Sequence, residues 1–395
     1  MKVGLSDIRG DTPACTSILH FNNAGASLMA SPVYKLMCDY LALEQSAGGY
    51  EAAAQSADLI DSFYTAFADL LNADPSEIAY VENATRAWDM AVYAIAFKAG
   101  DRVLVHQAEY ASNYLALLQL SRDKGIEIDI VPSDKSGQLD VTELELLITP
   151  RTKALFLTHI ASQTGGVNPA EKAGDIARKH GLIYVLDACQ SVGQMPVNVK
   201  AIGCDILCGT GRKFLRGPRG SGFLYVSQRI LKDLHPPFID LHSAEWTSTH
   251  DYTLRVDARR FEVWERFMAG QIALGAAARY AMDIGLDTIE ARIGDVAGAL
   301  REQLAAIDGV TLRDNGPRQS GIVTFEINGH SAPDVVTHLR AKGINTSAAQ
   351  VQHARLDLEA RGITSVVRAS VHYFNTTDEV ERFCKAIQTL ARETP

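Results

Sequence analysis

The chain has 395 residues and a formal net charge of −9, from 38 basic and 47 acidic side chains. Hydrophobic residues make up 47% and charged residues 22%, a balance that is typical of folded globular proteins and argues against intrinsic disorder. The acidic balance gives no reason to expect a nucleic-acid partner, and no apolar run approaches the ~20 residues needed to span a membrane.

The N-terminal residues Met1–Asp11 mix charges with glycine and lack the apolar core and small-residue cleavage site of a signal peptide. Six cysteines are few for a chain of this length. We therefore expect reduced thiols in a cytoplasmic protein. Cys204 and Cys208 have no second cysteine pair beside them, so we expect no zinc site and no other metal site.

Short apolar runs alternate with helical patterns between residues 77 and 226. The expected strands are Val103–Val105, Ile126–Val131, Ala154–Thr158 and Ile183–Leu186, and the expected helices are Ala111–Lys124, Val141–Ile148 and Ala170–His180. Continuous apolar strands between helices predict a mostly parallel sheet covered on both faces. Such sheets bind ligands at the carboxyl ends of their strands, so chemistry is expected just after each strand.

The second part of the chain has a different order of elements. Residues 227–262 look irregular, and a helix is expected over Arg266–Ile284. From about residue 290, the order helix, strand, strand, helix, strand, helix predicts a smaller α+β domain, with elements at Val310–Leu312, Ile322–Ile327, Ala332–Ala341, Val366–Val371 and Asp378–Arg392. We expect an N-terminal segment at 1–20 packing on the small domain, a large domain at 21–262 and a small domain at 263–395.

Asp187 and Lys213 form the most informative pair. Asp187 ends an apolar strand, and Lys213 lies in a glycine-rich turn after the run Ile206–Cys208. Desolvation and the neighbouring Arg212 would lower the pKa of the lysine and free its amine for imine chemistry. A carboxylate beside a pyridine nitrogen keeps that nitrogen protonated, as pyridoxal phosphate (PLP) requires to act as an electron sink. On its own, an aspartate after a strand is more typical of a helix cap, and a lysine in a glycine-rich turn is more typically solvated.

The segments Asp187-Ala188-Cys189-Gln190 and Thr210-Gly211-Arg212-Lys213 resemble those of class V aminotransferases, a family of fold-type I PLP enzymes. The resemblance runs from about Phe21 to the C-terminus. It implies an α/β large domain with a mostly parallel seven-stranded sheet flanked by helices, and a smaller α+β domain. It also implies that Lys213 is linked covalently to PLP, that Asp187 contacts the pyridine nitrogen and that Gln190 contacts the ring hydroxyl.

Other cofactor contacts follow the same resemblance. A helix expected to begin at Ala84 and Thr85 offers free N–H groups to a phosphate, and the family adds the Thr210 hydroxyl. The family often has a histidine where Arg212 stands, so we expect Arg212 to take over its phosphate contact. Tyr110 stands where desulfurases carry a ring-stacking histidine. Gln163, beside Ser162, lies in the loop that resembles the family's cofactor-facing Ser-Asn-x-x-Gly.

The substrate side is expected at Arg368, Asn23 and Ala24. A guanidinium grips a carboxylate with two hydrogen bonds, and the family uses an arginine at the position of Arg368 for the substrate α-carboxylate. Asn23 and Ala24 belong to the stretch Phe21–Gly25, which resembles a substrate-side loop of the family. Gly48–Tyr50 is expected to line the same pocket.

Two departures from the family shape the functional expectation. Desulfurases carry a sulfur-accepting cysteine before the arginine strand, but Gly343–Ser365 contains none, and a thiolate is needed to attack sulfur. Cys189 and Cys384 are expected to be packed in the core. The family's Gly-Thr-Pro after Phe261-Glu262 is also missing. We expect a homodimer with active sites at the subunit interface, with Trp264 or Arg260 in the place of that motif.

We therefore expect a PLP-dependent C–S lyase similar to the hercynylcysteine sulfoxide lyase type. It would cleave a small amino-acid substrate, a cysteine S-conjugate or its sulfoxide, by β-elimination to a thiol, pyruvate and ammonia. The alternatives are a class V aminotransferase or amino-acid epimerase, and less favoured, a cysteine desulfurase or selenocysteine lyase. A binding protein that keeps the fold without catalysis is a further alternative, because one fold hosts many functions.

Overall fold

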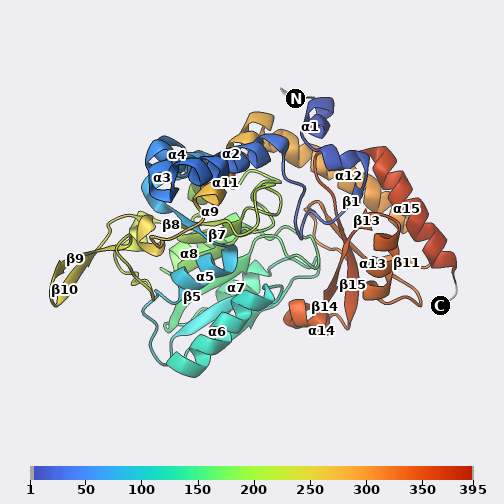
Figure 1. The fold of residues 1–395 in the computed structure, drawn as a ribbon. Helices are drawn as coiled ribbons and strands as arrows, with labels where there is room; N and C mark the ends of the chain where they lie inside the picture. The colour runs from blue at the N-terminus through green and yellow to red at the C-terminus, as the bar shows by residue number, and fades with distance from the viewer. Residues whose placement is uncertain (1–3, 394–395) are drawn as a thin grey trace.

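The computed structural model describes residues 4–393, and its centre is a seven-stranded sheet (Figure 1). The strand order is β2-β8-β7-β6-β5-β3-β4, and only β8 runs antiparallel to its neighbours. The mostly parallel sheet is therefore confirmed. The strands are β2 (Ile78–Val81), β3 (Arg102–His106), β4 (Glu127–Val131), β5 (Thr152–Thr158), β6 (Ile183–Asp187), β7 (Ile206–Thr210) and β8 (Gly222–Val226).

Helices cover both faces of this sheet, which is why its central strands are mostly apolar and are buried along most of their length. The covering helices in this part of the chain are α5 (Ala84–Val92), α6 (Ala111–Lys124), α7 (Val141–Leu146), α8 (Ala170–Lys179) and α9 (Val199–Ile202). The parallel register places Thr158 of β5 beside Asp187 of β6, and Asp187 beside Cys208 of β7. The carboxyl ends of three strands therefore meet at one place.

A layer of long helices lies over one side of the large sheet. It consists of α2 (Ser31–Ala47), α3 (Gly49–Gln55), α4 (Ala57–Leu71) and α11 (Met268–Ile284), and α11 packs against both α2 and α4. The sequence analysis passed over the first three, although Phe63, Phe67 and Leu71 repeat at helical spacing and are fully buried.

The small domain is built on a second sheet of order β11-β12-β15-β14, in which all neighbours are antiparallel. Its strands are β11 (Val310–Leu312), β12 (Ile322–Ile327), β14 (Ser347–Gln350) and β15 (Ser365–Ser370). Its helices are α12 (Leu286–Ala305), α13 (Ala332–Ala341), α14 (Arg355–Ala360) and α15 (Thr377–Arg392). Cys384 of α15 is buried in the apolar core, as expected.

The N-terminal segment lies against the small domain. The short strand β1 (Leu19–His20) pairs in parallel with β13 (Ile344–Asn345). In α1 (Leu5–Gly10), Arg9 forms an ion pair with Glu379 at 2.8 Å. Because α11 packs on the large domain while α12 packs on α15, we propose that the domain boundary falls at Gly285, later in the chain than residue 263.

Residues 227–262 contain more regular structure than their sequence indicates. They form α10 (Gln228–Leu231) and a hairpin of β9 (Ala244–Ser248) and β10 (Asp251–Leu254), which projects from the body of the molecule (Figure 1). A 3₁₀ turn at Ala258–Phe261 follows. Within residues 4–393, no helix is long and apolar enough to cross a membrane, and no cluster of side chains is suited to a metal ion.

Candidate active site

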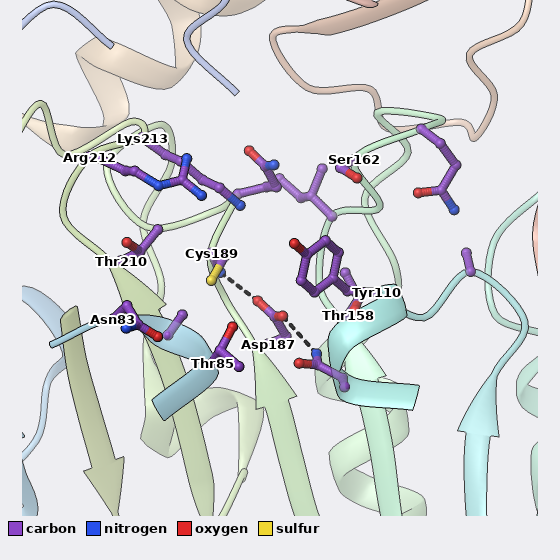
Figure 2. Close-up of a pocket in the computed structure, with 16 residues that line it drawn as sticks. Asn83, Thr85, Tyr110, Thr158, Ser162, Asp187, Cys189, Thr210, Arg212 and Lys213 are labelled. Atoms are coloured by element: carbon purple, nitrogen blue, oxygen red, sulfur yellow. Dashed lines mark hydrogen bonds between the residues drawn. The ribbon is translucent and has the colours of Figure 1, made fainter. Parts of the chain in front are cut away.

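A cavity of about 190 Å³ lies at the carboxyl ends of the parallel strands, where a ligand of this sheet type is expected (Figure 2). Loops after β2, β3, β5, β6 and β7 all contribute to its wall. The lining residues are Asn83, Ala84, Thr85, Ala108, Tyr110, Asn113, Thr158, Ile160, Ser162, Gln163, Asp187, Cys189, Gln190, Thr210, Arg212 and Lys213.

Lys213 reaches this cavity from the turn after β7, and its side chain is buried. Burial lowers the pKa of its amine; Cys189 and Asp187 oppose that effect, and the cations Arg212 and Arg368 add to it. This is the direction that the sequence indicates. The turn is tightly packed, because a Cβ on Gly193, whose φ is +94°, would lie 2.4 Å from the Phe214 carbonyl carbon.

Asp187 ends β6 with both carboxylate oxygens held. Oδ1 accepts a hydrogen bond from the Cys189 backbone N–H at 2.9 Å, and Oδ2 accepts one from the Asn113 side-chain amide at 2.8 Å (Figure 2). Only 4% of Asp187 is exposed. The strand thus presents an oriented carboxylate to the cavity. Cys189 is buried, as expected, and it also lines the cavity.

The sequence analysis missed the partner of Asp187. Asn113 of α6 also donates to Oε1 of Glu109 at 2.9 Å, and Glu109 is itself buried. Burial, together with the negative charge of Asp187, raises the pKa of Glu109 to about 7. Glu109 and Asn113 stand just after β3 in the sequence, where side chains near the cavity are expected. That position was the signal from which they could have been found.

The other end of the cavity suits a phosphate. Helix α5 begins at Ala84, and the first N–H groups of a helix lack partners within it. Thr85 and Thr210 bring hydroxyl groups to the same end (Figure 2). Arg212 lines the cavity as well, and its guanidinium hydrogen-bonds to the Gly25 carbonyl oxygen.

Two buried amides in the wall have polar atoms with no hydrogen-bond partner among the residues that the structure describes. These are Oε1 of Gln190 and Nε2 of Gln163, and both side chains are at most 4% exposed. Unpaired buried polar atoms are costly, so their presence in a cavity indicates a polar ligand. A buried lysine, an oriented carboxylate, a helix N-terminus and unpaired amides together fit a ring cofactor with an aldehyde, a pyridine nitrogen and a phosphate.

Arg368 of β15 approaches the cavity from the small domain. Its Nε donates to Ser347 Oγ at 3.0 Å, and its Nη1 lies 3.5 Å from the backbone oxygen of Ser162, a cavity residue. Burial lowers the pKa of this guanidinium to about 10, and the nearby Arg212 acts in the same direction. The neighbourhood of two guanidinium groups favours a carboxylate ligand.

Asn23 and Ala24 do not line the cavity. The Asn23 amide donates to the Ser370 carbonyl at 2.7 Å and accepts from the Ser27 hydroxyl at 2.7 Å, so it is satisfied within the protein. The Ala24 carbonyl accepts from the Gln190 amide at 3.2 Å. Both residues support the cavity wall, and their contact with the substrate stays a prediction.

Three further expectations concern the aromatic residues and Arg260. The Tyr110 ring centre lies 6.0 Å from Lys213 Nζ, within the cavity. Gly49 and Tyr50 line a different cavity, together with Trp264, so their placement in the first pocket was wrong. Arg260 points into the protein and donates to the Leu231 carbonyl, so it does not replace the missing Gly-Thr-Pro.

Comparisons with known proteins agree on one family. The aminotransferase class-V family model matches residues 19–383. A probable cysteine desulfurase of Methanothermobacter thermautotrophicus is 29% identical over 98% of both chains, and one of Xylella fastidiosa is 32% identical over 84% of this chain and 80% of its own. The solved apo structure of a cysteine desulfurase from Thermococcus onnurineus has a TM-score of 0.91, with 29% identity and 98% coverage of each chain.

These relatives correct the functional expectation. Their names favour a cysteine desulfurase, so the expected β-eliminating lyase of cysteine S-conjugates was wrong. That expectation gave too much weight to one missing cysteine and too little to similarity along the whole chain. The fold and the cofactor were inferred correctly. The protein belongs to the aminotransferase class-V family, has the fold of the fold-type I PLP enzymes and uses pyridoxal 5′-phosphate as its cofactor.

Proposed function

We propose that this protein is a cysteine desulfurase, which removes the sulfur of L-cysteine and leaves L-alanine. The observation that carries the proposal is the meeting of a buried lysine, an oriented carboxylate and a carboxylate-binding arginine around one cavity, in a chain whose relatives are named cysteine desulfurases. The names of those relatives favour this reaction over transamination or epimerisation.

Several cavity residues have a role in binding the cofactor. When bound, PLP supplies an electron sink for the bonds at the substrate α-carbon. Asp187 holds a proton on the pyridine nitrogen, and Ala84, Thr85, Thr210 and Arg212 bind the phosphate. Gln190 and Gln163 use their unpaired amide atoms to hold the ring substituents and the substrate.

Lys213 and Arg368 act on the substrate itself. Nζ of Lys213 takes the substrate α-proton as a general base, and the burial that lowers its pKa favours the neutral amine that this role needs. Arg368 binds the α-carboxylate with its paired N–H groups and so fixes the direction of the α-hydrogen. Tyr110, whose ring centre lies 6.0 Å from Lys213 Nζ, would offer a flat aromatic face to the cofactor ring.

The sulfur must leave to a nucleophile, and Gly343–Ser365 supplies no cysteine for that step. We propose that a thiol from outside the chain accepts it. The substrate C–S bond breaks, the Cβ atom gains a proton, and the thiol becomes a persulfide; a second thiol then releases sulfide and forms a disulfide. Atoms and electrons balance: Cβ is reduced by two electrons when its bond to sulfur is replaced by a bond to hydrogen, and the two thiols supply these electrons when they become a disulfide.

The direct test is product analysis with L-cysteine and excess dithiothreitol. We expect alanine and sulfide in equal amounts, and no activity for Lys213→Ala. The exposed-lysine variant Lys200→Ala is the matched control and should be as active as the unchanged protein. Pyruvate and ammonia in place of alanine would contradict the proposal.

We also propose a homodimer. The projecting hairpin and the loops beside it expose several large apolar side chains, and exposed apolar patches mark interaction surfaces. These side chains are Phe238, Leu241, Trp246, Tyr252, Val256 and Trp264. Light scattering should give twice the chain mass of 42.9 kDa, and a monomeric mass would contradict this proposal. The sparse cysteines support a reducing compartment such as the cytoplasm.

A further inference from the structure

A second buried carboxyl group lies behind the cavity wall. Glu109 does not line the cavity and is 3% exposed. Its Oε1 accepts three hydrogen bonds, from the Tyr110 backbone N–H at 2.8 Å, the Asn113 amide at 2.9 Å and the Thr158 hydroxyl at 2.5 Å. Its Oε2 is buried without a hydrogen-bond partner. The proposed mechanism gives this group no task, although its surroundings are elaborately built.

Asn113 connects the second carboxyl to the first. A side-chain amide nitrogen carries two hydrogens, and Nδ2 of Asn113 donates to Glu109 Oε1 at 2.9 Å and to Asp187 Oδ2 at 2.8 Å. Both hydrogens are therefore in use. Rotating the amide by half a turn would bring its oxygen against two carboxyl oxygens. The two acceptors therefore fix the amide with its nitrogen, and not its oxygen, toward Asp187.

We propose that Glu109 is a positioning residue for the cofactor: it orients Asn113, which in turn orients the Asp187 carboxylate toward the pyridine nitrogen. Asp187 has one protein donor on each oxygen, so the direction of its plane depends on both donors. The Cys189 donor is a fixed backbone group. The Asn113 donor is a side chain, and Glu109 is what restrains it.

Charge supports the same arrangement. Within residues 4–393, the titratable groups whose charge acts on Glu109 are Asp187 of β6 and the Cys208 thiol of β7, and no cation acts on it directly. Two charged carboxylates sharing one amide in a buried wall would repel each other. Below about pH 7 the neutral form of Glu109 predominates, and Asp187 is then the charged member of the pair that faces a protonated ring nitrogen. The task of Glu109 is thus to accept hydrogen bonds, and its own charge is not needed.

The test uses the full chain and measures cofactor binding directly, so it is independent of the desulfurase reaction and rests only on the proposed cofactor site. Cofactor-free protein is titrated with PLP, and both the dissociation constant and the visible absorbance band are recorded. Glu109→Gln keeps a neutral acceptor of the same shape, Glu109→Met removes the acceptor at similar volume, and Asn113→Ala removes the link. Glu143→Gln, at an exposed site on α7, is the control.

We expect Glu109→Gln and the control to bind PLP within about threefold of the unchanged protein, and Glu109→Met to bind at least about tenfold more weakly with a shifted band, as for a lost hydrogen bond to a charged group. Asn113→Ala should lose as much, and the double variant Glu109→Met/Asn113→Ala should lose no more than Asn113→Ala alone. Unchanged binding and absorbance in Asn113→Ala would overturn the proposal, even if Glu109→Met fails to fold. So would equal losses in Glu109→Gln and Glu109→Met, or additive losses in the double variant.

Discussion

Replacing Glu109 by glutamine should change how the stability of the cofactor-free protein depends on pH. The folded protein holds the Glu109 pKa at about 7, against 4.5 for an unperturbed glutamate, because the group is buried beside Asp187. Folding therefore favours the protonated form. The stabilisation is complete below the unfolded pKa and is lost as pH rises toward the folded value. Glutamine has no such proton to lose.

The size of the effect follows from the two pKa values. Each tenfold difference in proton affinity is worth about 1.4 kcal/mol, so the full stabilisation by proton uptake at Glu109 is about 3 kcal/mol. Between about pH 5 and pH 8, most of it should disappear, and the free energy of unfolding of the unchanged protein should fall by about 2.5 kcal/mol relative to Glu109→Gln.

Other buried groups also change protonation at acidic pH. The useful quantity is therefore the difference in the free energy of unfolding between the unchanged protein and Glu109→Gln. Burial lowers the pKa of His106 to about 3 and that of His159 to about 4. Both are depressed bases, whose protonation destabilises the folded state as pH falls, which is the opposite sign. They are present in both proteins, so their contributions cancel in the comparison.

Urea unfolding at a series of pH values measures this difference in the cofactor-free chains. Plotted against pH, the stability of the unchanged protein minus that of Glu109→Gln should slope downward between about pH 5 and pH 7 and level off above. A flat difference across this range would refute the reasoning, because it would mean that Glu109 ionises in the folded protein as easily as in the unfolded chain.

Two further predictions concern single residues near the cavity. Arg368→Lys should raise KM for L-cysteine about tenfold or more, because a single ammonium replaces two hydrogen bonds to the carboxylate. The visible band of bound PLP should stay unchanged. Steady-state kinetics and absorbance measure this, and an unaltered KM would exclude Arg368 from substrate binding. Gly193→Ala should lower the unfolding temperature markedly, because φ is +94° and the added Cβ would collide with the Phe214 carbonyl beside the Lys213 turn. Differential scanning calorimetry tests it, with Gly298→Ala, on an open helix surface, as the control that should be neutral or stabilising. Equal behaviour of the two variants would contradict the packing argument.

The sequence predicted the central sheet well because the pattern that marks each strand lies within the residues of that strand. Continuous apolar runs mark strands that are buried on both faces, and the strand ends then locate Asp187 and the turn of Lys213. The projecting β9–β10 hairpin was missed because its side chains are mostly exposed and carry no apolar alternation. The regular spacing in α4 was readable and was overlooked.

Residues that act through other residues were the hardest to foresee. Asn113 at the start of α6 contacts Asp187 of β6, and Glu109 in the preceding loop contacts Thr158 of β5. Their position after β3 indicates that they lie near the cavity, but it does not reveal these partners. Asn23 looked available in sequence, but Ser370 and Ser27 satisfy its amide in the folded chain. Tyr50 was assigned to the wrong cavity because its own segment does not show that it packs beside His242 and Trp264.

The central claim is that the amine of Lys213 carries the cofactor. The most direct measurement is borohydride reduction of the PLP-loaded protein, followed by digestion and mass spectrometry of the labelled peptide. The account predicts the mass of a reduced pyridoxal phosphate group on the peptide that contains Lys213 and on no other. A label on a different lysine, or no label in a protein that has been saturated with PLP, would contradict it.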